Sequence, residues 1–146
     1  MASITNSREF GPTDEATIAA FERVLNLLLP SDYRVFLLEH NGGIPSPDNF
    51  DLPFPSSPCV VETFFGLHDG PARTDLRGHQ AWLDLLLPEH LPIGYEQGGN
   101  PICLRLSACQ RGYVMLWDKT LDEGEASPTT FYELAPTFPA FLDLLY

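Results

Sequence analysis

Residues 91–120, LPIGYEQGGNPICLRLSACQRGYVMLWDKT, constrain the fold more than any other stretch of this chain. Glu96–Asn100 is a cluster of turn-forming residues. From Ile102 to Ser107, apolar side chains alternate with other types, which is the period of a half-buried β-strand. The run Tyr113–Trp117 is β-branched and aromatic, so it predicts a second strand, which Asp118 closes. The stretch therefore predicts turn, strand, loop, strand and turn.

Helical patterns lie on both sides of this region. Apolar residues recur at helical spacing, and the expected N-caps and helix breakers predict helices over 13–28, 31–40, 79–87 and 137–145. Thr13, Ser31 and Thr137 are the predicted N-caps of three of them. Asn41-Gly42-Gly43 ends the second helix, because Asn and Gly tolerate the left-handed conformation of a helix C-terminus. Further strands are predicted over 59–67 and 131–134.

The order of these segments predicts an α+β fold, with a mostly antiparallel central sheet and helices at the N- and C-terminal ends packed against it. A chain of 146 residues is the size of one domain. We therefore expect a loose leader over residues 1–12 and a single domain over 13–146. The proline-rich run Pro45–Pro58 predicts a loop or an irregular sheet edge, because proline lacks a backbone donor.

The charge of the chain narrows its possible partners. The formal net charge is −12, and each half contains ten acidic and four basic residues. Such a surface repels nucleic acid and attracts a basic partner, although simple solubility explains an acidic surface equally well. No apolar run suits a membrane span or a secretory signal, and three unpaired cysteines suit reduced thiols, so we expect a cytoplasmic protein.

No group of residues predicts catalysis, a cofactor or a metal site. Gly94 and Gly98-Gly99 suit a turn better than a phosphate loop, because an alternating strand follows them. The four histidines lack metal-ligand spacing. The remaining enzyme hypothesis is a small hydrolase that uses Cys103 or a histidine, and the alternating position of Cys103 predicts partial exposure beside Arg105. Trp117 and Asp118 suit core and turn structure better than a contact site.

Four segments, in this order, resemble the SUKH superfamily, which includes fungal cell-wall assembly regulators and many bacterial toxin-immunity proteins. They are LPSDYRVFLLEHNGG (Leu29–Gly43), FFGL (Phe64–Leu67), LPIGYEQGGNPICLRL (Leu91–Leu106), and the strand ending in Trp117-Asp118 with the later FYELAPTFPAFLDLL (Phe131–Leu145). The resemblance implies the same α+β architecture. The chain departs from the family's pattern at Lys119 and in Pro45–Pro58, so the resemblance assigns no binding residues.

The resemblance and the acidic surface together predict a non-catalytic binding protein. The leading hypothesis is an immunity protein that neutralises a cognate toxin domain with a basic surface, such as a nuclease. Carboxylates on loops are the expected contacts, namely Asp69, Asp75, Asp118, Asp122, Glu123 and Glu125. The alternative is a regulatory scaffold that binds a cellular partner.

Overall fold

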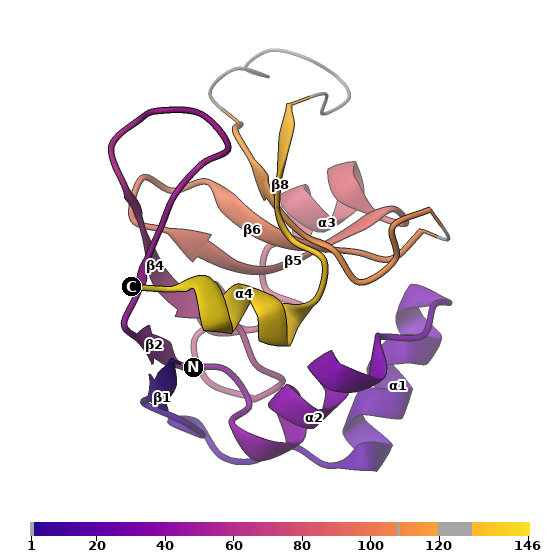
Figure 1. Ribbon diagram of the computed structural model, residues 1–146. Helices are drawn as coiled ribbons and strands as arrows, with labels where there is room; N and C mark the ends of the chain where they lie inside the picture. Colours follow the sequence, from indigo (N-terminus) through magenta and orange to yellow (C-terminus); the bar gives the residue numbers. More distant parts are fainter. Residues whose placement is uncertain (1, 108, 120–129) are drawn as a thin grey trace.

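The computed structural model describes residues 2–107, 109–119 and 130–146. Within them, four α-helices, one short 3-10 helix and eight strands form the predicted α+β fold (Figure 1). The helices are α1 (Glu15–Leu25), α2 (Ser31–Glu39), η1 (Ala72–Thr74), α3 (Gln80–Leu86) and α4 (Phe138–Leu144). The strands are β1 (Ser3–Thr5), β2 (Ile44–Ser46), β3 (Asn49–Phe50), β4 (Cys59–Phe64), β5 (His90–Glu96), β6 (Pro101–Arg105), β7 (Val114–Trp117) and β8 (Phe131–Ala135).

Strands β3 to β8 form one antiparallel sheet in which spatial order follows chain order. The sequence pattern predicts β6 and β7 but misses the central strand β5, because Pro92 and Gly94 are unfavourable in strand interiors. The β5–β6 register shifts between these two residues. At Gly94 a Cβ atom would lie 2.5 Å from the Thr63 carbonyl oxygen, so only glycine permits this close approach of β4.

The helix ends follow the predicted capping chemistry with two shifts. Asp14, rather than Thr13, is the N-cap of α1, and its carboxylate accepts a hydrogen bond from the Thr17 backbone at 2.8 Å. Ser31 is the first residue of α2 rather than its cap. Thr137 caps α4 as predicted. The first shift arises because Thr13 and Asp14 are both good caps, so sequence alone does not choose between them, whereas the N-cap position of α2 is Pro30, which offers no capping side chain.

The expectation of a loose leader over residues 1–12 is wrong for its first part. Strand β1 pairs with β2, with Ile4 opposite Pro45, and Ala2 is buried in the core. The β-branched Ile4 and Thr5 favour the extended conformation that this pairing needs. Strands β2 and β3 are both short and lie within the proline-rich run, which therefore forms an irregular edge, as predicted.

The main hydrophobic core lies between the sheet and the helices α1, α2 and α4. Phe36 of α2, Phe64 of β4 and Phe138 of α4 meet with ring centroids 4.6–5.7 Å apart. Tyr33 joins them from α2 and is fully buried. Such edge and tilted contacts are the favoured geometry of aromatic pairs, so this cluster fixes both helices on one face of the sheet.

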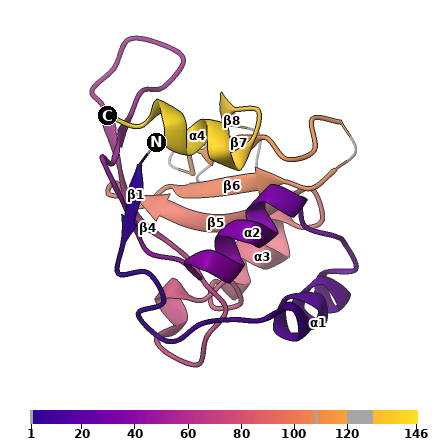
Figure 2. The same cartoon turned by 60° about the horizontal axis from the view of Figure 1, so that its bottom comes forward.

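The opposite face of the sheet is also covered, by α3 (Figures 1 and 2). Leu86 of α3 packs there with Cys103, Met115 and Trp117. Strands β6 and β7 are consequently buried on both faces, whereas the alternating sequence predicts a half-buried strand. The alternating pattern places Cys103 on the outer face of the strand and so predicts its partial exposure. Cys103 is buried instead, because a cysteine behaves as a small apolar residue and fits the second cluster under α3.

The predicted Asn41-Gly42-Gly43 helix end also ties α2 to the sheet. Asn41 has a φ of 49° and Gly42 has a φ of 94°, both left-handed. The buried Asn41 amide accepts from the Leu67 N–H at 2.8 Å and donates to the Leu67 carbonyl at 2.9 Å. It also donates to the Gly11 carbonyl at 3.0 Å. One side chain therefore connects the N-terminal segment, the end of α2 and the segment after β4.

Candidate partner-binding surface

The carboxylates predicted to bind a partner do not gather at one place. Asp122, Glu123 and Glu125 lie outside the described residues. Asp118 follows β7 at the end of the sheet where Cys59 begins β4, whereas Asp69 and Asp75 lie beyond the opposite end of β4. The predicted role of these residues in binding a partner stays a prediction.

Asp75 is a structural residue in the loop around η1. Its carboxylate is 12% exposed and accepts from the Arg77 guanidinium through both oxygens, at 3.0 and 2.8 Å. This hydrogen bonding raises the pKa of Arg77. Asp69 is exposed and lines a hollow of about 470 Å³ with Phe10, Arg77 and others. Because Asp75 is buried and paired, its charge contributes less to the outer surface than that of Asp69.

Asp118 belongs to a group of carboxylates from three separate elements. Burial raises the pKa of the Cys59 thiol, and the nearby charges of Glu96, Asp118 and Asp51 raise it further. These three carboxylates therefore lie near Cys59 at one end of the sheet, where Asp51 is exposed, Asp118 is half-buried and Glu96 is only 7% exposed. We call Asp51, Glu96 and Asp118 the acidic end. Asp118 was predicted as a contact from the sequence, whereas Asp51 in the proline-rich run and Glu96 in the predicted turn were not.

The Glu96–Asn100 turn builds this end of the sheet. The Glu96 carboxylate accepts from the Asn100 N–H at 2.8 Å, and a Cβ at Gly98 would lie 2.6 Å from that carboxylate. The Asn100 side chain in turn accepts from the Lys119 N–H at 3.2 Å. The turn between β5 and β6 thus holds the residues after β7, next to Asp118, through Asn100. Its glycines are structural, as the sequence predicts.

The proline-rich loop adds an aromatic side chain near the acidic end. Phe54 is 44% exposed and contacts Tyr132 of β8 edge-on, with ring centroids 5.1 Å apart. Asp51, at the start of this loop, accepts from the Tyr146 hydroxyl at 2.5 Å. Partly exposed aromatic rings beside polar groups are favoured at protein interfaces. The acidic end therefore offers both charge and an apolar contact.

Cys103 does not have the environment of a nucleophile. The prediction of partial exposure is wrong, because α3 covers this face and Cys103 is fully buried. Burial raises the pKa of its thiol far above the usual range. A thiol that stays protonated is a poor nucleophile, so the enzyme hypothesis loses its candidate residue. Trp117 fills the same cluster and is 5% exposed, as predicted for a core residue.

The four histidines have separate structural surroundings. His40 contacts the Ser7 hydroxyl, His68 contacts the Thr74 carbonyl, His79 stacks between Phe65 and Trp82, and His90 stacks on Phe131. Within the described part of the chain, no three His, Cys, Asp or Glu side chains are grouped to hold a metal. Burial lowers the pKa of His90 to about 4, with a further contribution from the charge of Arg105.

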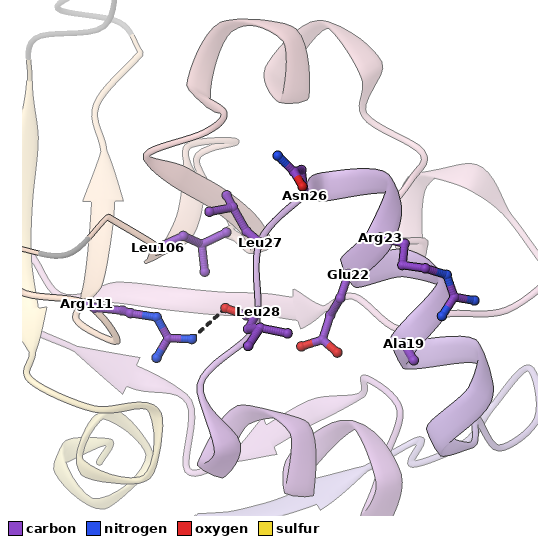
Figure 3. Close-up of a pocket in the computed structure, with 8 residues that line it drawn as sticks. All are labelled: Ala19, Glu22, Arg23, Asn26, Leu27, Leu28, Leu106 and Arg111. Carbon is purple, nitrogen blue, oxygen red and sulfur yellow. Dashed lines mark hydrogen bonds between the residues drawn. The ribbon is translucent and has the colours of Figure 1, made fainter.

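A groove of different character lies at the other end of β6 and β7. It has a volume of about 830 Å³ and runs between the last turn of α1, the α1–α2 linker and the β6–β7 loop (Figure 3). Leu27, Leu28 and Leu106 supply apolar walls, while Arg23 and Arg111 stand on opposite sides of the view. The groove could not be predicted from the sequence, because its residues come from distant parts of the chain.

The fold and these surfaces define a small α+β domain with features of a protein-binding module. Its described helices all fall short of the length and apolar character that crossing a membrane requires. The sequence profile of the SMI1/KNR4 family (SUKH-1) matches residues 12–144, and the chain belongs to this family. At the level of the family, this is a toxin-immunity or regulatory domain, a class that is generally non-catalytic. No curated protein matches the chain.

Proposed function

We propose that this SUKH-1 domain is an immunity protein that binds and neutralises a cognate toxin domain through the acidic end. The observation that carries the proposal is the strand pairing, which brings Asp51 after β3, Glu96 at the end of β5 and Asp118 after β7 to the end of the sheet where Cys59 begins β4. Family membership supports the general role, and the geometry supports the choice of surface. The expected partner is a toxin domain with a basic face, such as a nuclease.

Electrostatics explains how this surface would act. A net charge of −12 attracts a basic protein over long range and speeds the encounter. Asp51 and Asp118 then face the cations with which a nuclease contacts phosphates, while the buried Glu96 adds its negative charge to the field at this end. Phe54 supplies apolar contact area beside them. The domain therefore neutralises its partner by occupying a basic surface and needs no chemical step.

A regulatory scaffold that binds a cellular partner is the second candidate. The observation that favours it is the groove in Figure 3, because its two arginines do not suit a basic toxin. The two functions differ in the partner that they require. A toxin domain bound in a salt-sensitive manner supports immunity, whereas a cell-envelope or housekeeping partner bound at the groove supports the scaffold.

The first experiment identifies the partner by affinity purification of the tagged protein from its native cell at low and moderate salt. Association rates are then measured for wild type and for Asp51→Asn/Glu96→Gln/Asp118→Asn. The control is Glu9→Gln/Glu39→Gln/Glu89→Gln, which removes the same charge from exposed sites elsewhere. We expect about tenfold slower association for the first variant and a smaller change for the control.

The salt dependence of association adds a second criterion. Neutralising the acidic end should also flatten the dependence of the association rate on ionic strength, because fewer charges steer the encounter. Equal effects of the two triple variants would contradict the acidic end as the binding surface. Recovery of only cellular proteins, with no toxin domain, would contradict the immunity function itself.

A further inference from the structure

The backbone at the groove in Figure 3 is held in place by side chains. Asn26 ends α1 with a φ of 56°, and the Glu22 carboxylate accepts from the Leu29 N–H at 2.7 Å. Arg111 donates to the Leu28 carbonyl from the other wall. The linker between α1 and α2 is therefore fixed at two successive residues. A groove that is already formed loses little conformational entropy when a ligand binds.

This fixed linker holds an apolar side chain in solvent. Leu28 is 71% exposed and lines the groove together with the half-buried Leu27. Leu106, which is 3% exposed, lines the same groove. A single exposed apolar residue is ordinary, but three leucines that line one hollow of about 830 Å³ form an apolar surface that a partner can cover.

The charge of the groove is opposite to that of the molecule. The chain has 20 acidic and 8 basic residues, yet Arg23 and Arg111 both line this groove. Among the described residues that line it, Glu22 is the one carboxylate. It is 7% exposed and forms an ion pair with Arg34, so its charge is compensated. The accessible charge of the groove is therefore positive.

We propose that this groove is a second docking surface, which binds an acidic amphipathic helix of a partner protein. Leucine-type side chains of the helix would cover Leu28 and Leu106, and flanking carboxylates would pair with Arg23 and Arg111. Guanidinium groups suit this task because they bind carboxylates through two parallel hydrogen bonds. An amphipathic helix laid in an apolar groove is a common mode of peptide recognition. The proposal is independent of the function assigned to the acidic end.

The test uses two synthetic helical peptides of about 15 residues, each with leucines at i, i+3, i+4 and i+7. One peptide has glutamates on its flanks and the other has lysines at the same positions. Binding to the full chain is measured by fluorescence anisotropy, and amide chemical shifts locate the site. We expect the acidic peptide to bind at the groove with a Kd of about 10–100 µM.

Charge reversal separates specific docking from general attraction. We expect Arg23→Glu to weaken binding of the acidic peptide at least about fivefold, because a cation is replaced by an anion beside the peptide carboxylates. Arg73→Glu is the matched control, since Arg73 is also exposed and lies outside the groove. Arg23 is preferred to Arg111 for this test because Arg111 also holds the Leu28 carbonyl.

Three results of the peptide experiments would overturn the proposal, and two others would do so as well. The three are failure of the acidic peptide to bind at about 1 mM, equal weakening by Arg23→Glu and Arg73→Glu, and chemical shift changes outside the groove. Self-association of the chain that Leu28→Ser abolishes would also overturn it, because a second copy would then be the occupant. Preference for the lysine peptide at the groove would contradict the charge argument directly.

Discussion

Cys59 and His90 lie at opposite ends of the sheet, and different charges act on them. Cys59 begins β4, where burial and then the charges of Glu96, Asp118 and Asp51 raise the pKa of its thiol. His90 begins β5, where burial and then Arg105 lower the pKa of its imidazole to about 4, while the charge of Glu89 acts in the opposite direction. The charges that act on Cys59 are all negative, whereas those that act on His90 have both signs.

The two ends also differ in how they are built. The acidic end is assembled from a turn, a strand end and a proline-rich loop, and its carboxylates satisfy local backbone and hydroxyl donors. The arginine-lined groove depends on a buried ion pair between Glu22 and Arg34, which fixes the linker. Substitution of Asp51 or Asp118 should mainly change binding, whereas substitution of the buried Glu96 or of residues beneath the groove should also change stability.

The largest expected effect on stability comes from a substitution beneath the groove. Replacing Arg34 with Met leaves the Glu22 carboxylate buried without its cation, which should lower the free energy of unfolding by about 3 kcal/mol. Urea unfolding measures this change. Arg23→Met is the control, because Arg23 is exposed, and it should change stability by less than about 0.5 kcal/mol. Equal effects of the two substitutions would show that the buried pair does not support the groove.

A smaller effect on stability is expected from the protonation of His90 as the pH falls. The pKa of His90 is about 4 in the folded protein, below the ordinary value of 6.5. The unfolded chain therefore binds a proton more readily, and the stability from neutral His90 is complete above about pH 6.5 and is lost as pH falls toward 4. Between pH 7 and pH 5 this loss should be about 2 kcal/mol.

His90→Phe isolates this contribution. The ring can keep its stacking on Phe131, and within the described residues the imidazole Nε2 has no hydrogen-bond partner to lose. Thermal or urea unfolding from pH 7 to pH 5 should show a flatter decline for the variant than for wild type. Equal losses of stability in the variant and in wild type over this pH range would contradict the lowered pKa of His90.

Much of the fold could be predicted from the sequence, because helix caps, turn glycines and alternating strands act over a few residues. The Thr137 cap and the Glu96–Asn100 turn are examples. β5 and the burial of Cys103 could not be predicted, since each depends on a neighbour distant in the chain. Gly94 needs the approach of β4, and Cys103 needs the cover of α3.

The candidate sites were predicted less well for the same reason. Asp118 was identified from its loop position, but its neighbours Asp51 and Glu96 come from other elements and were missed. Arg23 and Arg111 meet only because the α1–α2 linker packs on the β6–β7 loop. For the groove, the available sequence signal was that basic residues such as Arg23 and Arg111 are rare in this acidic chain.

The central claim is that three carboxylates from separate elements act as one charged surface, and Cys59 tests it most directly. The reaction rate of Cys59 with iodoacetamide is measured against pH in a Cys109→Ser background, with Cys103 buried and unreactive. Asp51→Asn/Glu96→Gln/Asp118→Asn should lower the pKa of Cys59 and speed the reaction near neutral pH, whereas Arg23→Glu should leave both unchanged. An unchanged Cys59 pKa in the triple variant would contradict the claim.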